Sequence, residues 1–146
     1  EFAPCPPTEQ PSLSAALGDS RELLFRWVTA VERLDADEAA SFYAETGMAF
    51  WGTFGDHCRT SRTGAHDYFR RFLAADSIQC SVRETHWRAL GEKAVLATGW
   101  YEFRIARDGA PAQAAPARFT FAFRRMPDRS WLIIEHHSSL FPENGY

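Results

Sequence analysis

SWLIIEHHSSLFPE, residues 130–143, is the stretch from which the fold can be inferred. It begins as an apolar, β-branched run, which is typical of a strand. It then becomes polar without a turn residue, so the strand is expected to continue until Pro142 ends it. Because side chains on a strand alternate between two faces, one face is predicted to carry Trp131, Ile133, Glu135, His137 and Ser139, and the other Leu132, Ile134, His136 and Ser138. Each face therefore carries a histidine and a serine after its apolar residues. On the interior face these side chains are enclosed, so their polar atoms need hydrogen-bond partners.

The first half of the chain predicts three helices and a brief strand over residues 48–51. The first helix is expected to reach about Leu34, because apolar residues recur at three- to four-residue spacing from Leu23 onward. Each helix follows a side chain that can accept a hydrogen bond from its first turn; the candidates are Asp19 or Ser20, Asp35 or Asp37, and Ser61 or Thr63.

The second half predicts four long strands, over residues 77–90, 93–107, 117–126 and 130–139. Turn signals separate them, at Gly91-Glu92, Asp108-Gly109 and Pro127-Asp128. Consecutive strands joined by short turns form antiparallel hairpins. Helices followed by such a meander predict an α+β fold, with the helices on one face of a strongly curved antiparallel sheet.

Composition limits the domain organisation and the partners. The 146 residues suit one domain, and four prolines among the first 18 residues predict an extended lead-in over 1–18 before a domain at 19–146. The 16 basic and 19 acidic residues give a net charge of −3 without a basic stripe, which argues against nucleic acid as a partner. No apolar run is long enough to span a membrane.

Compartment and disulfide state stay open at the level of sequence. The chain opens on Glu1-Phe2 instead of Met, as a processed mature chain would. Its three cysteines, Cys5, Cys58 and Cys80, match no metal-binding spacing and allow either one disulfide or three free thiols.

The polar end of the last strand is the first candidate site. His136 and His137 are adjacent and therefore point to opposite faces, so they cannot hold one metal ion together. Ser138 and Ser139 lack the Gly-x-Ser-x-Gly pattern of acyl-transfer nucleophiles. A serine hydroxyl both donates and accepts hydrogen bonds, however, so either serine suits a small oxygen-rich ligand.

Two further hydroxyls have both a structural and a functional interpretation. Tyr68 can be a core ring whose hydroxyl bonds to the backbone, or it can point into a pocket between helix and sheet. Thr53, in Gly-Thr-Phe-Gly, can simply belong to a tight turn. The aromatic residues Trp87, Trp100 and Tyr101 are interpreted as packing or as a dimer face.

The order of elements and the His-His-Ser-Ser tail resemble the cone-shaped NTF2-like superfamily, and within it the branch related to the calmodulin-dependent kinase II association domain. Four motifs are similar to the iota-class carbonic anhydrases: Phe50-Trp51-Gly52-Thr53, Asp67-Tyr68-Phe69, Pro116-Ala117-Arg118-Phe119-Thr120-Phe121, and the tail His136-His137-Ser138-Ser139-Leu140-Phe141-Pro142-Glu143. The resemblance covers roughly residues 19–143.

This resemblance implies reversible hydration of CO2 to bicarbonate in the pocket of the cone, with no metal and no other cofactor. In metal-free members of the class a threonine, a tyrosine and a serine hold water and substrate. Carried over, these are Thr53, Tyr68 and one of Ser138 and Ser139, and Ser139 is taken as the catalytic serine. Ser138, His136 and His137 are then expected to contact the substrate, with His137 relaying the proton.

Some expectations from the resemblance are less direct. Members with manganese are also described, although no ligand set is visible in this chain. The class has a third histidine where this chain has Glu135, and a carboxylate lining the pocket would oppose a bicarbonate product. A homodimer through the outer face of the sheet is expected.

Two alternatives compete with the carbonic anhydrase. One is a non-catalytic module that binds a small ligand or drives oligomerisation. The other is an isomerase or cyclase acting on a larger ring substrate, which would need a general base in the pocket, and Glu135 is the one candidate.

Overall fold

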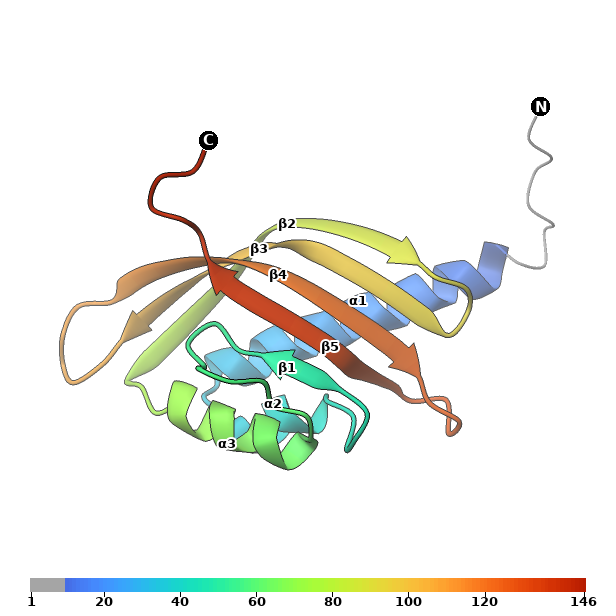
Figure 1. Cartoon of the computed structure of the whole chain (residues 1–146), viewed down its shortest axis with the longest axis horizontal. Helices are drawn as coiled ribbons and strands as arrows, with labels where there is room; N and C mark the ends of the chain where they lie inside the picture. The colour runs from blue at the N-terminus through green and yellow to red at the C-terminus, as the bar shows by residue number, and fades with distance from the viewer. Residues whose placement is uncertain (1–9) are drawn as a thin grey trace.

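A curved five-stranded sheet with three helices on one face forms the molecule (Figure 1). In this computed structural model, residues 10–146 are described. The helices are α1 (Gln10–Glu32), α2 (Ala36–Ser41) and α3 (Arg62–Phe72). The strands are β1 (Ala49–Trp51), β2 (Ser77–Ala89), β3 (Ala94–Ala106), β4 (Gln113–Arg125) and β5 (Trp131–Leu140). Their order across the sheet is β1-β5-β4-β3-β2, so the predicted α+β arrangement is confirmed.

The start of α1 differs from the sequence prediction. The helix begins at Gln10, so an extended conformation over 1–18 is wrong for residues 10–18, and residues 1–9 lie outside the described part of the chain. Pro11 does not prevent this, because a proline in the first turn lacks only an N–H that has no helical partner there.

The buried stripe of α1 also begins earlier than its large apolar residues suggest. Ala16 and Ser20 are 2% and 0% exposed and continue the stripe of Leu23, Leu24, Trp27, Ala30 and Val31 toward the N-terminus. Ser20 is thus a core residue and not an N-cap. Because its first members are small or polar, hydrophobic periodicity did not reveal this extension.

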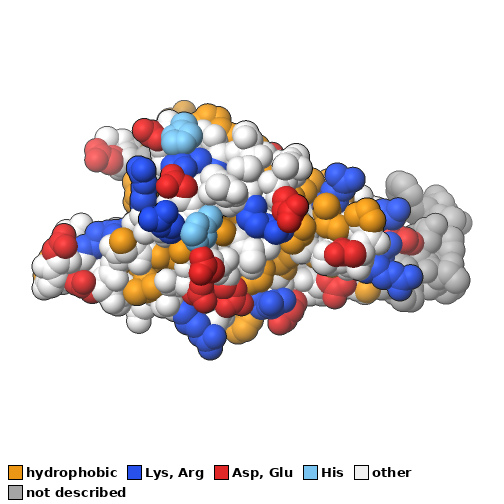
Figure 2. Space-filling view, turned by 90° about the horizontal axis from the view of Figure 1, so that it is seen from below, with side chains coloured by type: hydrophobic (Ala, Val, Ile, Leu, Met, Phe, Trp, Pro, Cys, Tyr) orange, Lys and Arg blue, Asp and Glu red, His pale blue; other side chains and the backbone are white. Residues whose placement is uncertain are grey.

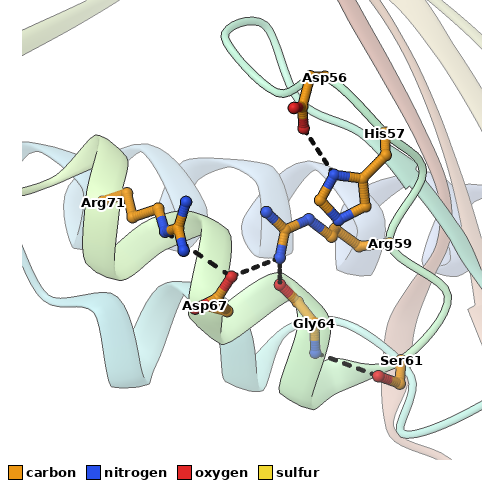
Figure 3. A network of polar contacts seen from close by, with 7 residues as sticks. All are labelled: Asp56, His57, Arg59, Ser61, Gly64, Asp67 and Arg71. Atoms are coloured by element: carbon orange, nitrogen blue, oxygen red, sulfur yellow. Dashed lines mark hydrogen bonds and ion pairs between the residues drawn. The ribbon is translucent and has the colours of Figure 1, made fainter.

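The caps of the two shorter helices agree with the prediction. The side chain of Asp35 accepts a hydrogen bond from the N–H of Glu38 at the start of α2. Ser61 accepts one from the N–H of Gly64 at the start of α3 (Figure 3). Each cap satisfies one of the amide groups that a helix N-terminus leaves without a partner.

Strand β5 does not alternate strictly, which corrects the predicted faces. Glu135 pairs with Ala122 and Ile133 pairs with Phe123, so Ile134 has no counterpart in the ladder. Such a β-bulge moves the residues before it to the opposite face. Ile133, at 0% exposed, therefore lies on the same interior face as His136 and Ser138, and not with His137 as predicted.

The short strand β1 pairs with β5 in parallel. Its register places Phe50 opposite His136 and Trp51 opposite His137. The sequence predicted a strand here but not its partner. This pairing carries the turn that follows β1 to the polar end of β5, far away along the chain.

The interior of the sheet is largely aromatic. Phe119, Phe121 and Phe123 of β4 are buried, and they alternate along the strand as residues on one face do. Tyr101 of β3 is also fully buried and stacks on Trp27 of α1, with ring centroids 5.8 Å apart. It is therefore an interior residue and not part of an outer dimer face. Trp87 and Trp100 are half-buried.

Within residues 10–146, no helix is both long and apolar enough to cross a membrane. Cys58 and Cys80 are free thiols, and Cys5 lies outside the described residues.

A close approach of strands at Gly99 generates the first testable prediction. A Cβ atom on Gly99 would lie 1.9 Å from the carbonyl oxygen of Glu84, next to the register shift between Val82 and Glu84. We expect Gly99→Ala to lower the free energy of unfolding by about 3 kcal/mol, since backbone must move. Urea denaturation followed by circular dichroism measures this change.

Gly18→Ala is the matched control for that variant. Gly18 lies on the exposed side of α1, and a methyl group added to it would have nothing within 4 Å. Alanine there should raise the stability by about 1 kcal/mol through helix propensity. Equal effects of the two substitutions would contradict the proposed clash at Gly99.

Candidate active site

A small cavity lies in the interior between the helices and the sheet. Its volume is about 10 Å³, roughly the space that a single water-sized molecule needs. Most of its wall is aromatic and apolar, and four polar side chains face it. The lining residues are Trp27, Phe50, Thr53, Tyr68, Phe69, Phe72, Tyr101, Phe103 and His136.

Ser138 and Thr53 meet at one end of this cavity. Ser138 Oγ and Thr53 Oγ1 are 2.5 Å apart, and Tyr101 donates its hydroxyl proton to Ser138 Oγ at 2.7 Å. Ser138 is 4% exposed, whereas Thr53 is half-buried. The parallel pairing of β1 with β5 brings these two hydroxyls together from positions 85 residues apart in the sequence.

His136 lies behind this pair, enclosed by aromatic rings. Its imidazole is stacked between Phe121, at a centroid distance of 3.8 Å, and Phe50, at 4.9 Å. Its two nitrogens contact the hydroxyls of Tyr43, at 2.7 Å, and Tyr101, at 3.1 Å. Burial holds the pKa of His136 well below its usual value, and the neighbouring His137 lowers it further. The ring is therefore neutral at physiological pH.

The hydrogen-bond pattern determines which nitrogen of His136 carries the proton. The indole N–H of Trp27 donates to the hydroxyl of Tyr43, which in turn lies 2.7 Å from His136 Nδ1. The proton of this fully buried tyrosine is satisfied only if it is donated to Nδ1. The proton of the imidazole then resides on Nε2 and is donated to Tyr101.

The result is a continuous chain of donors in one direction. It runs from Trp27 through Tyr43, His136, Tyr101 and Ser138 to Thr53. Because Thr53 accepts from Ser138, its own proton is available to a molecule in the cavity. Hydrogen bonds in such a chain polarise and strengthen one another.

Tyr68 of α3 also lines the cavity, against the turn that holds Thr53. Its ring packs directly on Gly52, where a Cβ atom would lie 2.3 Å from two ring carbons, so only glycine fits there. Its hydroxyl accepts a hydrogen bond from the N–H of Phe54 at 3.3 Å. The proton of Tyr68 therefore remains free to be donated.

The site carries no charge at neutral pH. Burial raises the pKa of Tyr68 to about 12, and the hydrogen bond from the N–H of Phe54 offsets only part of this effect. Burial likewise raises the pKa values of Tyr43 and Tyr101 well above the usual range. With His136 neutral as well, the cavity is an uncharged space whose mainly aromatic wall contains a few hydroxyl groups.

The structure brings together four of the six residues proposed from the sequence. Thr53, Tyr68 and His136 line the cavity, and Ser138 is bonded to Thr53. His137 and Ser139 are exposed, because they alternate to the outer face of β5. Their assigned roles as proton relay and catalytic serine remain predictions.

Three residues around the cavity were not recognised as polar partners from the sequence. Tyr101 was interpreted as packing or as part of a dimer face, but it donates to Ser138, and Tyr43 and Trp27 belong to the same series of hydrogen bonds. The only available signal was that two tyrosines and a tryptophan occupied core positions, where their polar atoms need partners. Glu135, the position that departs from the iota class, is not among the lining residues.

The donors needed for a metal site are not gathered anywhere in residues 10–146. No group of three or more His, Cys, Asp or Glu side chains in that range could hold a metal ion. Around the cavity the polar groups are hydroxyls and one imidazole whose two nitrogens are already engaged.

The comparisons with known proteins point to one superfamily. The SnoaL-like domain family matches residues 21–143. A Xanthomonas campestris structure named after the calcium/calmodulin-dependent protein kinase II association domain is 27% identical, with a TM-score of 0.79 over 86% of this chain and 87% of that one. No curated protein is significantly similar in sequence.

More distant structures share the fold alone. An NTF2-like family protein from Streptomyces avermitilis, named as a dehydratase, is 18% identical with a TM-score of 0.77, over 88% of this chain and 98% of that one. A Novosphingobium aromaticivorans protein named as a scytalone dehydratase is 7% identical with a TM-score of 0.80, over 91% and 89% of the two chains. The architecture is therefore the NTF2-like cone that the sequence predicted.

The neutral state of His136 predicts a specific pH dependence of stability. Below about pH 6.5, the ordinary pKa of histidine, the unfolded chain binds a proton that folded His136 does not. Stability should therefore fall as the pH decreases from there, by up to about 1.4 kcal/mol per pH unit from this group. Urea unfolding between about pH 7.5 and pH 5 measures the slope.

His136→Gln is the comparison variant for this experiment. A glutamine amide can accept from Tyr43 and donate to Tyr101 but does not titrate. Its stability should depend less on pH in the same interval, even if it is lower throughout. Parallel curves for the two proteins would show that His136 is not the titrating group.

Proposed function

The chain belongs to the SnoaL-like domain family, and we propose that it is a carbonic anhydrase of the iota type, which hydrates CO2 reversibly to bicarbonate. The observation that carries the proposal is the convergence of hydroxyl groups on a cavity the size of one small molecule. The similarity of its sequence motifs to that class adds support.

The size of the cavity favours a small substrate over a large one. Sites for drug-sized or ring-shaped ligands occupy about 300 to 1,000 Å³. The interior cavity, at about 10 Å³, is far below that range. CO2 has no net dipole, so aromatic walls accept it without the cost of leaving a polar group unpaired.

The uncharged site favours a proton relay through hydroxyls over a single strong base. The cavity holds one water-sized molecule, so the other reactant reaches the half-buried Thr53 from outside it. The hydroxyl of Thr53 can accept a proton from the attacking water while it gives its own proton to an oxygen of CO2. A C–O bond then forms as one C=O π bond breaks, and the product is carbonic acid. Carbonic acid ionises to bicarbonate once it reaches water, so the step needs no charged intermediate in the cavity.

In this scheme the remaining polar groups stabilise the transition state and orient the hydroxyl of Thr53. The free proton of Tyr68 is donated to the CO2 oxygen on which negative charge develops. Ser138, oriented by Tyr101 and His136, fixes the direction of the Thr53 hydroxyl. Without a metal to lower the pKa of the water, we expect a slower catalyst than zinc carbonic anhydrases.

A non-catalytic binding module is the second candidate. It is favoured by one observation: every residue in the series of hydrogen bonds from Trp27 to Ser138 already has a partner without a ligand. Such a network can simply satisfy buried polar groups. A folded protein that hydrates CO2 no faster than the buffer, in a stopped-flow assay with a pH indicator, would favour this candidate.

The adjacent serines provide the sharpest test of the catalytic site. Ser138→Ala removes the hydroxyl bonded to Thr53 and should lower kcat/KM for CO2 hydration about 100-fold, as removal of a preorganised catalytic donor does. Ser139→Ala, on the exposed outer face, should stay within about twofold of the wild type, a change of less than 1 kcal/mol. Larger loss in Ser139→Ala would instead support Ser139 as the catalytic serine.

Metal removal tests the relay mechanism separately. We expect dialysis against a chelator to leave the hydration rate unchanged, because the proposed proton transfers use only hydroxyl groups of the chain. Metal content is measured by elemental analysis before and after dialysis. Loss of activity that manganese or zinc restores would contradict a metal-independent mechanism.

A further inference from the structure

A second, more open pocket adjoins the interior cavity. Its volume is about 310 Å³, and it lies between α3, the turn after β1, and the residue that follows β3. Tyr68 and Phe72 line both the pocket and the cavity. The other lining residues are Phe54, Gly55, Asp56, Arg59, Arg71 and Arg107. This open pocket therefore shares part of its wall with the proposed reaction site.

The lining of this pocket is positively charged. Three arginines face one carboxylate, Asp56, whose side chain is 93% exposed and contacts His57 at 2.6 Å. Asp67, behind the pocket wall, neutralises part of this charge through its 2.6 Å ion pair with Arg59 (Figure 3). The three arginines outnumber the carboxylates of Asp56 and Asp67 by one positive charge.

The arginines differ in how firmly they are held. Arg107 donates to the carbonyls of Phe72 and Ala74 at the end of α3. Arg59 is held by Asp67 and by the Gly64 carbonyl, and its Nε is buried with no hydrogen-bond partner in the described part of the chain. Arg71 is 78% exposed, and its nearest carboxylate is Asp67 at 3.9 Å. Because this long ion pair is the one polar contact of its guanidinium in the described part of the chain, the exposed group can turn toward a ligand.

This local excess differs from the general character of the surface. Seen from below, basic and acidic side chains are interspersed over the face that Figure 2 shows. The whole chain has a net charge of −3. A concave site with three guanidinium groups is therefore a specific feature and not part of a basic face. Guanidinium groups bind carboxylate-like oxygens well because their donors match the planar geometry.

We propose that this pocket binds bicarbonate as it leaves or enters the interior cavity. The inference rests on the proposed function, in which an uncharged cavity forms a product that becomes an anion outside it. Tyr68 and Phe72 line both the pocket and the cavity, so their rings form the boundary between the two, and Phe54 stacks on Phe72 from the pocket side at a centroid distance of 5.3 Å. Positive charge beyond this boundary raises the local concentration of the anion.

Direct binding of sodium bicarbonate to the whole protein tests this site. In a ¹⁵N-labelled sample at constant ionic strength, the amide signals of Gly55 and Arg71 should shift and saturate as bicarbonate replaces chloride. Arg71→Gln should weaken this binding at least about fivefold, a difference near 1 kcal/mol. Absence of saturable shifts in the wild type would overturn the proposal.

Arg70→Gln is the matched control. It removes the same charge from the adjacent position of α3, but Arg70 lines a different surface depression together with Asp35, Asp37 and His66. Bicarbonate binding should remain within about twofold of the wild type, below 1 kcal/mol. Equal weakening of binding in the two variants would show that only the net charge matters, which would contradict a specific site.

Two additional measurements separate this inference from the proposed function. Thr53→Val should lose CO2 hydration and still bind bicarbonate, because Thr53 does not line this pocket. In the dehydration direction, Arg71→Gln should raise the KM for bicarbonate while Arg70→Gln does not. Bicarbonate binding without any hydration activity would support the pocket and overturn only the carbonic anhydrase assignment.

Discussion

The parallel pairing of β1 with β5 is the interaction on which the site depends. Strand β5 carries His136 and Ser138 into the interior, where their polar atoms need partners. Only the short β1, in register with His136, delivers the turn that holds Thr53 to the same place. The close fit of Tyr68 on Gly52 then closes this turn over the cavity. Three segments distant in sequence are thus fixed to one another by backbone pairing and tight packing.

Burial gives this arrangement its electrostatic character. A charged imidazole or phenolate would be costly in an aromatic interior, so the pKa of His136 is lowered and those of the tyrosines are raised. What remains is a line of neutral groups whose hydrogen bonds share one direction. Charge is found instead outside, in the arginines beside Tyr68 and Phe72. The uncharged cavity therefore suits an apolar molecule, whereas the basic pocket suits an anion.

Much of the fold followed from local patterns. The alternating phenylalanines of β4, the caps at Asp35 and Ser61, and the turn residues between strands were readable because each reflects interactions between near neighbours in sequence. The errors have equally specific causes. The bulge at Ile134 reversed the predicted face of Ile133, and the small residues Ala16 and Ser20 concealed the first turns of α1.

The sequence by itself determined the order of helices and strands and named Thr53, Tyr68, His136 and Ser138 among the site candidates. Tertiary structure decided which of two adjacent serines faces inward, that Tyr101 and Tyr43 hold the imidazole, and that the cavity admits only a small molecule. The physical reason is the range of the interactions involved. Periodicity and capping are local, whereas a strand register, a bulge and a buried hydrogen bond depend on partners that the chain meets only after it has folded.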